Sequence, residues 1–374
     1  MKKENACAEL DNVIREIGFP GTVLSCKAFG NGHINDTFSV YCRQADGSTS
    51  RYVLQRINHE IFKNPMQVME NVTRITTFLK DKIERGGGDP SRETLSFLPM
   101  PGGNYCYRDS IGSYWRSYRF IENAVSFDQV ERSEDFYQSA VAFGRFQFLL
   151  SDFDAGNLHE TIKNFHNTPV RYQAFLDAVK RDPLGRAASV REEIEFVRKR
   201  EKDMGAITTL LNKKEIPLRV THNDTKLNNV LFDEKSRRAI CVIDLDTVMP
   251  GTVLIDFGDS IRFGASTGEE DEPDLSKIWF DLDLFETYTR GYLKGCSNSL
   301  TPTEVEMMPM GAKLMTLECG MRFLTDYLEG DTYFKIQREG HNLDRCRTQF
   351  KLVADMEGKW DRMRGLIREI EQEK

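Results

Sequence analysis

The sequence predicts an α+β protein with two lobes, a small β-sheet lobe at the N-terminus and a larger, mainly helical lobe after it. Short runs rich in β-branched and aromatic residues, divided by glycine-containing turns, occupy most of residues 22–57 and return at 94–121. From Ser133 onward, most apolar residues recur at helical spacing instead. The 374 residues are enough for two or three packing units. We therefore predict a small lobe of residues 1–120 and a large lobe of residues 121–374.

The small lobe should open with a helix over residues 5–17, which a glycine and a proline end. Its strands are predicted at 23–29, 38–43, 51–57, 94–100, 104–109 and 113–121. The Asp46-Gly47 pair between the second and third of these runs is a strong signal for a hairpin turn. A second helix should cover residues 64–82, because its second residue is a proline and proline is favoured in the first turn of a helix.

The large lobe should contain a helix from Ser133 and further helices over residues 171–212, 279–293, 307–328 and 344–371. The acidic run at 268–274 is interpreted as an exposed loop, because a run of like charges is usually solvated. Three short apolar runs interrupt this helical pattern and predict buried strands, at 218–220, 229–232 and 239–245.

Composition argues against several kinds of partner. A net charge of −7 does not suit nucleic acid, because phosphate binding requires a basic surface. No apolar run approaches the length of a membrane span, and the first residues lack the apolar core of a signal peptide. We therefore expect a cytoplasmic protein with small-molecule partners. The 8 cysteines include no C-x-x-C pair, so we expect free thiols and no zinc site.

Two polar clusters lie between the apolar runs of residues 218–245. One contains Asp224, Lys226 and Asn229 within a single loop, and the other contains Asp244 and Asp246 at the end of the last strand. A carboxylate at the edge of a buried strand is costly unless it is paired or binds a metal ion. Three converging carboxylates would also repel one another. A divalent cation and a polyphosphate would offset that repulsion.

Each residue type in these clusters has a possible role in phosphoryl transfer. Asp224 would orient or deprotonate a hydroxyl group, and Lys226 would balance phosphate charge. Asn229 and Asp244 would hold magnesium, with a secondary contribution from Asp246. The order Asp, then Asn, then a strand ending in Asp is the order of the catalytic loop in protein-kinase-like phosphotransferases.

The loop HNDTKLNN at 222–229 fits the H-x-D-x(4)-N pattern, and the chain resembles the aminoglycoside phosphotransferase and choline kinase superfamily. Within it, the chain is most similar to bacterial N-acetylhexosamine 1-kinases. That closer resemblance rests on GNGHINDTF (30–38), YVLQRIN (52–58), HNDTKLNNV (222–230), IDLDTVMPG (243–251), LECGMRFLTDYLEGD (317–331) and YFKI with HNLDRCR (333–347). It implies a two-lobed protein-kinase-like fold. It also implies ATP- and Mg²⁺-dependent phosphorylation of the anomeric hydroxyl of N-acetylglucosamine and N-acetylgalactosamine, with Asp224 as base.

The nucleotide site is expected in the small lobe and at the hinge between the lobes. Gly30 and Gly32 would let backbone amides approach phosphates, although a Gly-Asn-Gly run is also an ordinary turn. Gln55 stands where a kinase-like protein has its phosphate-binding lysine. Backbone groups from Arg119 to Glu122 would contact adenine, because ligands prefer such junctions.

The acceptor site is predicted from the resemblance. His33 and Asp36 would reach sugar hydroxyls, and the alternative for this segment is a solvated loop. Arg322 would donate to hydroxyls or to the N-acetyl carbonyl, and Tyr333 would lie nearby. The spacing alone favours another interpretation of Arg322. Glu318 and Asp326 lie four residues before and after it, so the three could form an ion-pair ladder on a surface helix.

The tripeptide Asp256-Phe257-Gly258 spells the magnesium-binding motif of protein kinases, but it follows Asn229 at too great a distance for that role. The shorter connection gives the metal role to Asp244. Asp256 instead resembles a later aspartate of the family, which braces the catalytic loop from the start of a helix.

Two alternatives remain. One is a kinase of the same fold for another acceptor, such as another sugar, an aminoglycoside or choline. The other is a non-catalytic nucleotide-binding module, which the missing strand lysine would favour. Arg56, next to Gln55, could replace that lysine, but alternation along a strand places neighbours on opposite faces.

Overall fold

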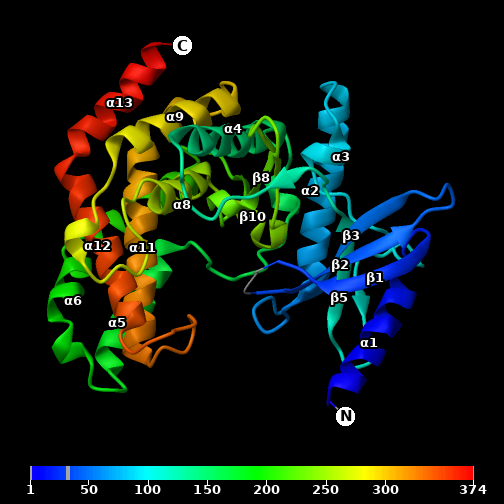
Figure 1. Ribbon diagram of the computed structural model, residues 1–374. Helices are drawn as coiled ribbons and strands as arrows, with labels where there is room; N and C mark the ends of the chain where they lie inside the picture. The colour runs from blue at the N-terminus through cyan, green and yellow to red at the C-terminus, as the bar shows by residue number, and fades with distance from the viewer. Residues whose placement is uncertain (1, 31–33, 374) are drawn as a thin grey trace.

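The computed structural model describes residues 2–30 and 34–373 and gives side chains from Leu10 onward. Gly32 and His33 therefore lie outside the described residues. Figure 1 shows a sheet lobe and a larger helical lobe side by side, with the N-terminus in the first and the C-terminus at the far side of the second. The predicted α+β, two-lobed fold is confirmed. None of the helices in the described part of the chain is long and apolar enough to cross a membrane.

The sheet lobe is built on a five-stranded antiparallel sheet in the order β1-β2-β3-β5-β4. The strands are β1 (Thr22–Ala28), β2 (Asp36–Arg43), β3 (Thr49–Ile57), β4 (Tyr107–Arg108) and β5 (Tyr114–Arg119). The predicted hairpin turn is confirmed: Gly47 has a φ of 83°, and the Asp46 carboxylate accepts a hydrogen bond from the Ser48 amide at 2.9 Å. The predicted strand at 94–100 is wrong apart from a single bridge between Phe97 and Tyr118. Prolines in and after this segment lack the N–H that a regular ladder needs.

Two helices cover opposite faces of the sheet, α1 (Lys2–Ile17) and α2 (Pro65–Arg85). Asn64 caps α2 through its side chain, as expected for a helix with a proline in its first turn. The buried face of α2 packs on the sheet and also on helical-lobe residues such as Val220, Leu245 and Val248. One apolar cluster therefore joins the two lobes, and α2 is the element that they share.

The helical lobe holds the remaining elements. Its helices are α4 (Ser133–Leu149), α5 (Thr168–Arg181), α6 (Arg191–Arg198), α7 (Ala206–Asn212), α8 (Val253–Gly264), α9 (Leu282–Cys296), α10 (Pro302–Glu306), α11 (Met308–Glu329), α12 (His341–Gly358) and α13 (Trp360–Gln372), and the short α3 (Pro90–Glu93) precedes them. Two small antiparallel sheets contain β6 (Ala124–Val125), β7 (Arg219–Thr221), β8 (Val230–Asp233), β9 (Ala239–Val242) and β10 (Met249–Gly251).

Three further predicted elements, all in the helical lobe, differ from the structure. The helical region at 171–212 is three helices, and the closing helix is two, because α12 ends before Lys359 and α13 starts after it. The last predicted strand stops at Val242, earlier than 245. Asp244 has a left-handed backbone with φ of 57° and begins a 3₁₀ turn, Leu245–Thr247. Asp244 and Asp246 therefore lie on a turn after the strand.

Helix α8 packs closely on α11, and Gly258 makes this possible. A Cβ atom at Gly258 would come within 2.3 Å of the Gly311 carbonyl oxygen. Phe257 is fully buried in the core beside Phe285 and Tyr292. The Asp-Phe-Gly tripeptide is thus explained by helix packing and by the role of its aspartate, described next.

Candidate active site

The catalytic loop between β7 and β8 is held by Asp256 in the first turn of α8. The Asp256 carboxylate accepts hydrogen bonds from the backbone amides of His222 at 2.9 Å and Asn223 at 2.8 Å. It also accepts one from Gln147 Nε2 at 3.0 Å. Burial raises the pKa of Asp256, while its bonds to the loop act in the opposite direction. Asp256 therefore has the bracing position that the resemblance implies.

His222 fixes the direction of the loop from inside the core. Its ring is buried against Phe143 and Phe146, and its Nε2 lies 2.8 Å from the carbonyl oxygen of Ile243. Its Nδ1 accepts a hydrogen bond from the Asp224 amide at 3.3 Å. Since Nε2 must donate to a carbonyl, Nδ1 is the acceptor, and this tautomer holds the backbone of Asp224.

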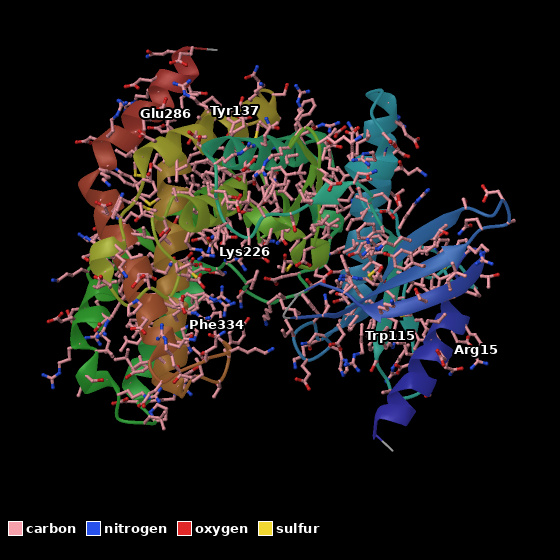
Figure 2. All side chains as sticks on the ribbon, in the orientation of Figure 1. Arg15, Trp115, Tyr137, Lys226, Glu286 and Phe334 are labelled. Atoms are coloured by element: carbon pink, nitrogen blue, oxygen red, sulfur yellow. The ribbon has the colours of Figure 1, made fainter. Side chains whose placement is uncertain are left out.

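Asp224, Lys226 and Asn229 converge as predicted from the motif. Lys226 Nζ lies 3.0 Å from Asp224 Oδ1, and Asn229 Nδ2 donates to the Asp224 carbonyl at 2.8 Å and to Oδ2 at 3.2 Å. The charge of Asp224, followed by that of Asp259, raises the pKa of Lys226. Both side-chain hydrogen bonds of Asn229 are donated by Nδ2, so the side-chain oxygen Oδ1 is the atom suited to a metal ion. Figure 2 shows Lys226 on the part of the helical lobe nearer to the sheet lobe.

Asp244 is the second oxygen donor with the character of a magnesium ligand. It is exposed on the turn after β9, yet surrounding protein and the charges of Asp246 and Asp224 raise its pKa to about 6. Within the described residues, no three acidic, histidine or cysteine side chains form a group that could hold a metal by themselves. This fits Mg²⁺, which usually binds through one or two carboxylates together with substrate phosphates. Asn229 and Asp244 are a donor set of that kind.

Asp246 differs from Asp244, because its carboxylate is buried and both of its oxygens are engaged. Oδ1 pairs with Arg116 of β5, and Oδ2 accepts a hydrogen bond from Asn35 Nδ2 at 2.7 Å. Both partners come from the sheet lobe. Asp246 therefore connects the two lobes next to Asp244, and a metal role for both aspartates stays a prediction. Neither Arg116 nor Asn35 was predicted from the sequence to belong to the site.

The predicted nucleotide residues of the sheet lobe have varied surroundings. Gly30 has a φ of 80°, and a Cβ atom there would meet nothing within 4 Å of it among the described residues. Gln55 lies between β2 and β5, where Nε2 donates to Thr37 and Oε1 accepts from Arg116. At the hinge, the amide of Arg119 donates to Ser96. The carbonyl of Glu122 accepts from Arg92 at 2.9 Å. Adenine contact by this hinge stays a prediction.

The stripe on α11 is not a surface ion-pair ladder. Glu318 is fully buried and binds His166 Nδ1 at 2.8 Å and the Thr168 hydroxyl at 2.6 Å. Asp326 is also buried, and its carboxylate accepts the backbone amides of residues 332–334 at 2.8–2.9 Å. The ladder interpretation is wrong because this face of α11 packs inward against α5 and the 332–334 loop.

Arg322 lies among aromatic rings between these two acids. Its guanidinium carbon is 5.3 Å from the ring centre of Phe165, 5.6 Å from that of Phe334 and 5.9 Å from that of Tyr333. Tyr333 is 63% exposed. Figure 2 shows Phe334 on the same side of the helical lobe as Lys226. Arg322 and Tyr333, both predicted for the acceptor, are therefore brought together.

The residues around Arg322 that were predicted for the acceptor are linked to the catalytic loop through His166. Its Nε2 lies 3.4 Å from the carbonyl oxygen of Asn223, next to Asp224, while Nδ1 contacts Glu318. The side chain of His166 is only 7% exposed, so this contact lies inside the lobe. Asp36 is half-exposed and pairs with Arg56, which lies opposite it in the β2–β3 register. A sugar contact by Asp36 stays a prediction.

The fold and the site together define a kinase-like phosphotransferase for small molecules. An antiparallel sheet lobe meets a helical lobe, and the junction presents an Asp-Lys-Asn loop beside the turn that carries Asp244 and Asp246. Residues 25–291 match the phosphotransferase enzyme family, to which the chain belongs.

Solved structures show the same fold at low sequence identity. An aminopropanol kinase associated with a microcompartment has a TM-score of 0.59 at 13% identity, and the match covers 95% of this chain and 97% of that one. A choline kinase from Cryptosporidium parvum has a TM-score of 0.58 at 14% identity, covering 96% and 97%. An amicoumacin kinase in complex with AMP-PNP and Ca²⁺ has a TM-score of 0.56 at 11% identity, covering 98% and 96%.

Proposed function

We propose that this kinase transfers the γ-phosphoryl group of ATP to the anomeric hydroxyl of an N-acetylhexosamine, N-acetylglucosamine or N-acetylgalactosamine. The observation that carries the proposal is the position of Arg322 among three rings, linked through His166 to the catalytic loop. A guanidinium donates to hydroxyl and carbonyl oxygens and does not suit a cationic acceptor. Aromatic faces beside it suit a sugar ring.

Asp224 would take the proton of the anomeric hydroxyl as that oxygen forms its bond to phosphorus. The bond from phosphorus to the bridging oxygen breaks at the same time, and ADP leaves. Lys226, held 3.0 Å from Asp224, offsets negative charge at the transferred group. Asn229 and Asp244 would hold Mg²⁺, which supplies charge neutralisation on the phosphates. The protein contributes position and electrostatics, and no covalent intermediate is required.

The direct test is ADP release with ATP and Mg²⁺ over a panel of free sugars, aminoglycosides, choline, ethanolamine and aminopropanol. We expect a response only to N-acetylhexosamines, with the product phosphate on the anomeric carbon by ³¹P NMR. Turnover with amines alone would overturn the sugar assignment and leave the role of Asp224 standing. Nucleotide binding without turnover on any acceptor would favour a non-catalytic module.

Amine acceptors are the second candidate, because similar structures include an aminopropanol kinase and a choline kinase. The rings of Phe165, Tyr333 and Phe334 could accept a cation through their faces. However, Arg322 already occupies that position, and its charge would repel a second cation. For this reason we place the sugar first.

A further inference from the structure

The sheet lobe has a cation beside the position where the strand lysine is missing. In the β3–β5 register, Gln55 lies directly opposite Arg116. Their side chains are on the same face of the sheet, since Arg116 Nε donates to Gln55 Oε1 at 3.0 Å. A guanidinium on β5 is therefore fixed next to the side chain at position 55.

Arg116 points at the metal-binding turn. Its Nη1 pairs with the Asp246 carboxylate, and its guanidinium carbon lies 5.8 Å from the centre of the Phe97 ring. Against the effect of burial, the charges of Asp246 and, less strongly, Asp244 raise the pKa of Arg116. Its contacts with described residues use Nε and Nη1, which leaves Nη2 for a further acceptor.

Stability alone is a poor explanation for this pair. Taking an arginine and an aspartate out of water costs about as much as their attraction returns, and apolar residues of similar size often serve as well. The pair is instead placed where the lobes meet, and Asn35, which precedes β2, binds the other oxygen of Asp246. Asn35 also accepts the Asn58 amide at 3.0 Å. Asn35, β5 and the Asp244–Asp246 turn are thus fixed together.

The two arginines of β3 do not occupy this place. Arg56 is on the opposite face of β3 and pairs with Asp36 at the surface. Arg51 shares the face of Gln55 but lies four residues earlier on the strand, where the rings of Phe29 and Phe120 and the Ser39 hydroxyl hold it. Of the arginines on β3 and β5, Arg116 is the one paired with the Asp244–Asp246 turn.

We propose that Arg116 supplies, from β5, the positive charge for the nucleotide phosphates that a lysine on β3 supplies in kinase-like proteins. Asp246 is the acidic partner of Arg116, in the way that a glutamate on a helix is the partner of the β3 lysine in those proteins. Glu70 of α2 is not available for this role, because it binds His159 at 2.6 Å at the surface. The inference rests on the kinase function proposed above, but it does not depend on which acceptor is used.

The test is nucleotide binding by calorimetry with Mg²⁺ and without acceptor, comparing ATP with adenosine. In Arg116→Gln, ATP affinity should fall by about 10- to 100-fold, the range for losing a hydrogen bond to a charged group. Adenosine affinity should not change, because adenosine has no phosphate. The double variant Gln55→Lys, Arg116→Gln moves the positive charge from β5 to β3 and should regain most of the ATP affinity.

Arg43→Gln is the matched control, because Arg43 is an exposed arginine at the far end of β2. It should bind both ligands as the parent protein does. Unchanged ATP binding in Arg116→Gln, or an equal loss for ATP and adenosine, would overturn the proposal. So would failure of the double variant to bind ATP better than the single one. If circular dichroism shows that Arg116→Gln is unfolded, the double variant and Arg116→Lys are measured in its place. Both keep a cation at this pair of positions, so both should still bind ATP more tightly than adenosine. A negative sugar panel would leave this binding result unaffected.

Discussion

Two loops of the helical lobe are each held through their backbone amides by a buried aspartate, but they differ in how exposed they are. Asp256 binds the amides of His222 and Asn223 in the catalytic loop, and Asp326 binds the amides of residues 332–334 in the acceptor loop. The catalytic loop has further support. Thr225 donates its amide to Asp259 at 2.9 Å and its hydroxyl to the Asp256 carbonyl at 2.6 Å.

The 332–334 loop also has further support, since Asn342 donates to Asp331 at 2.9 Å and Phe334 packs on Phe323, but Tyr333 at its surface is largely exposed. The two loops thus use the same local device with different burial. We therefore expect the chemistry, which needs position within a fraction of an ångström, on the buried loop and recognition of the acceptor on the more exposed one. The difference predicts that damage to the first loop lowers kcat, whereas damage to the second raises KM for the acceptor.

The largest effect is expected for Asp224→Asn. The amide cannot accept the hydroxyl proton, and it loses the charge that pairs with Lys226. Turnover should fall by about 10²- to 10⁴-fold, the range for removal of a general base. ATP affinity, measured by calorimetry, should stay near that of the parent protein. A variant that keeps the parent kcat would show that Asp224 is not the base.

The brace aspartates give the direct comparison between the loops. Asp256→Asn places an N–H group where three donors meet, so the catalytic loop should shift and kcat should fall by about 10²-fold. Asp326→Asn should instead raise KM for the sugar with kcat little changed. Steady-state kinetics on both variants measure this. Equal losses of kcat in the two variants would contradict the division of roles.

Arg322→Gln should act on the acceptor only. It keeps a donor but removes the charge that faces the three rings, so we expect KM for the sugar to rise by about 10-fold with ATP affinity unchanged. Arg171→Gln is a useful comparison, because Arg171 lies nearby and donates to the Phe165 carbonyl at 3.1 Å. It should change KM less. A higher rate with choline in Arg322→Gln would show that the arginine excludes amines.

Separation along the sequence explains which parts of the site could be predicted. Asp224, Lys226 and Asn229 lie in one loop, so their spacing alone brings them together. Arg116 lies 61 residues from Gln55 and 130 from Asp246, and only the β3–β5 register and the lobe junction join them. Alternation gives the face of a strand residue but not its partner on the next strand.

Periodicity has the same limit on helices. It placed Glu318, Arg322 and Asp326 on one face of α11, as the structure shows, but it could not tell whether that face meets solvent or another element. The two acids proved to be buried because α5 and the loop after α11 cover them. Similarly, the apolar run at 239–245 did not reveal that β9 ends at Val242 or that Asp244 has a left-handed backbone, since backbone conformation there depends on its neighbours.

The smallest effect is expected at Glu318, which contacts the His166 link between the two loops, and this effect depends on pH. Glu318 faces His166, Thr168 and Arg322. Burial raises the pKa of Glu318, but the hydrogen bond and charge of His166, followed by the charge of Arg322, outweigh burial and lower that pKa below its usual value. A carboxyl group with a lowered folded-state pKa adds stability above its unfolded pKa, and this contribution is lost as pH falls through the lowered value. Glu318→Gln should therefore show a shallower loss of stability between pH 6 and acid conditions, by chemical denaturation at each pH. If the variant and the parent lose stability in parallel over that range, Glu318 is not the group that responds.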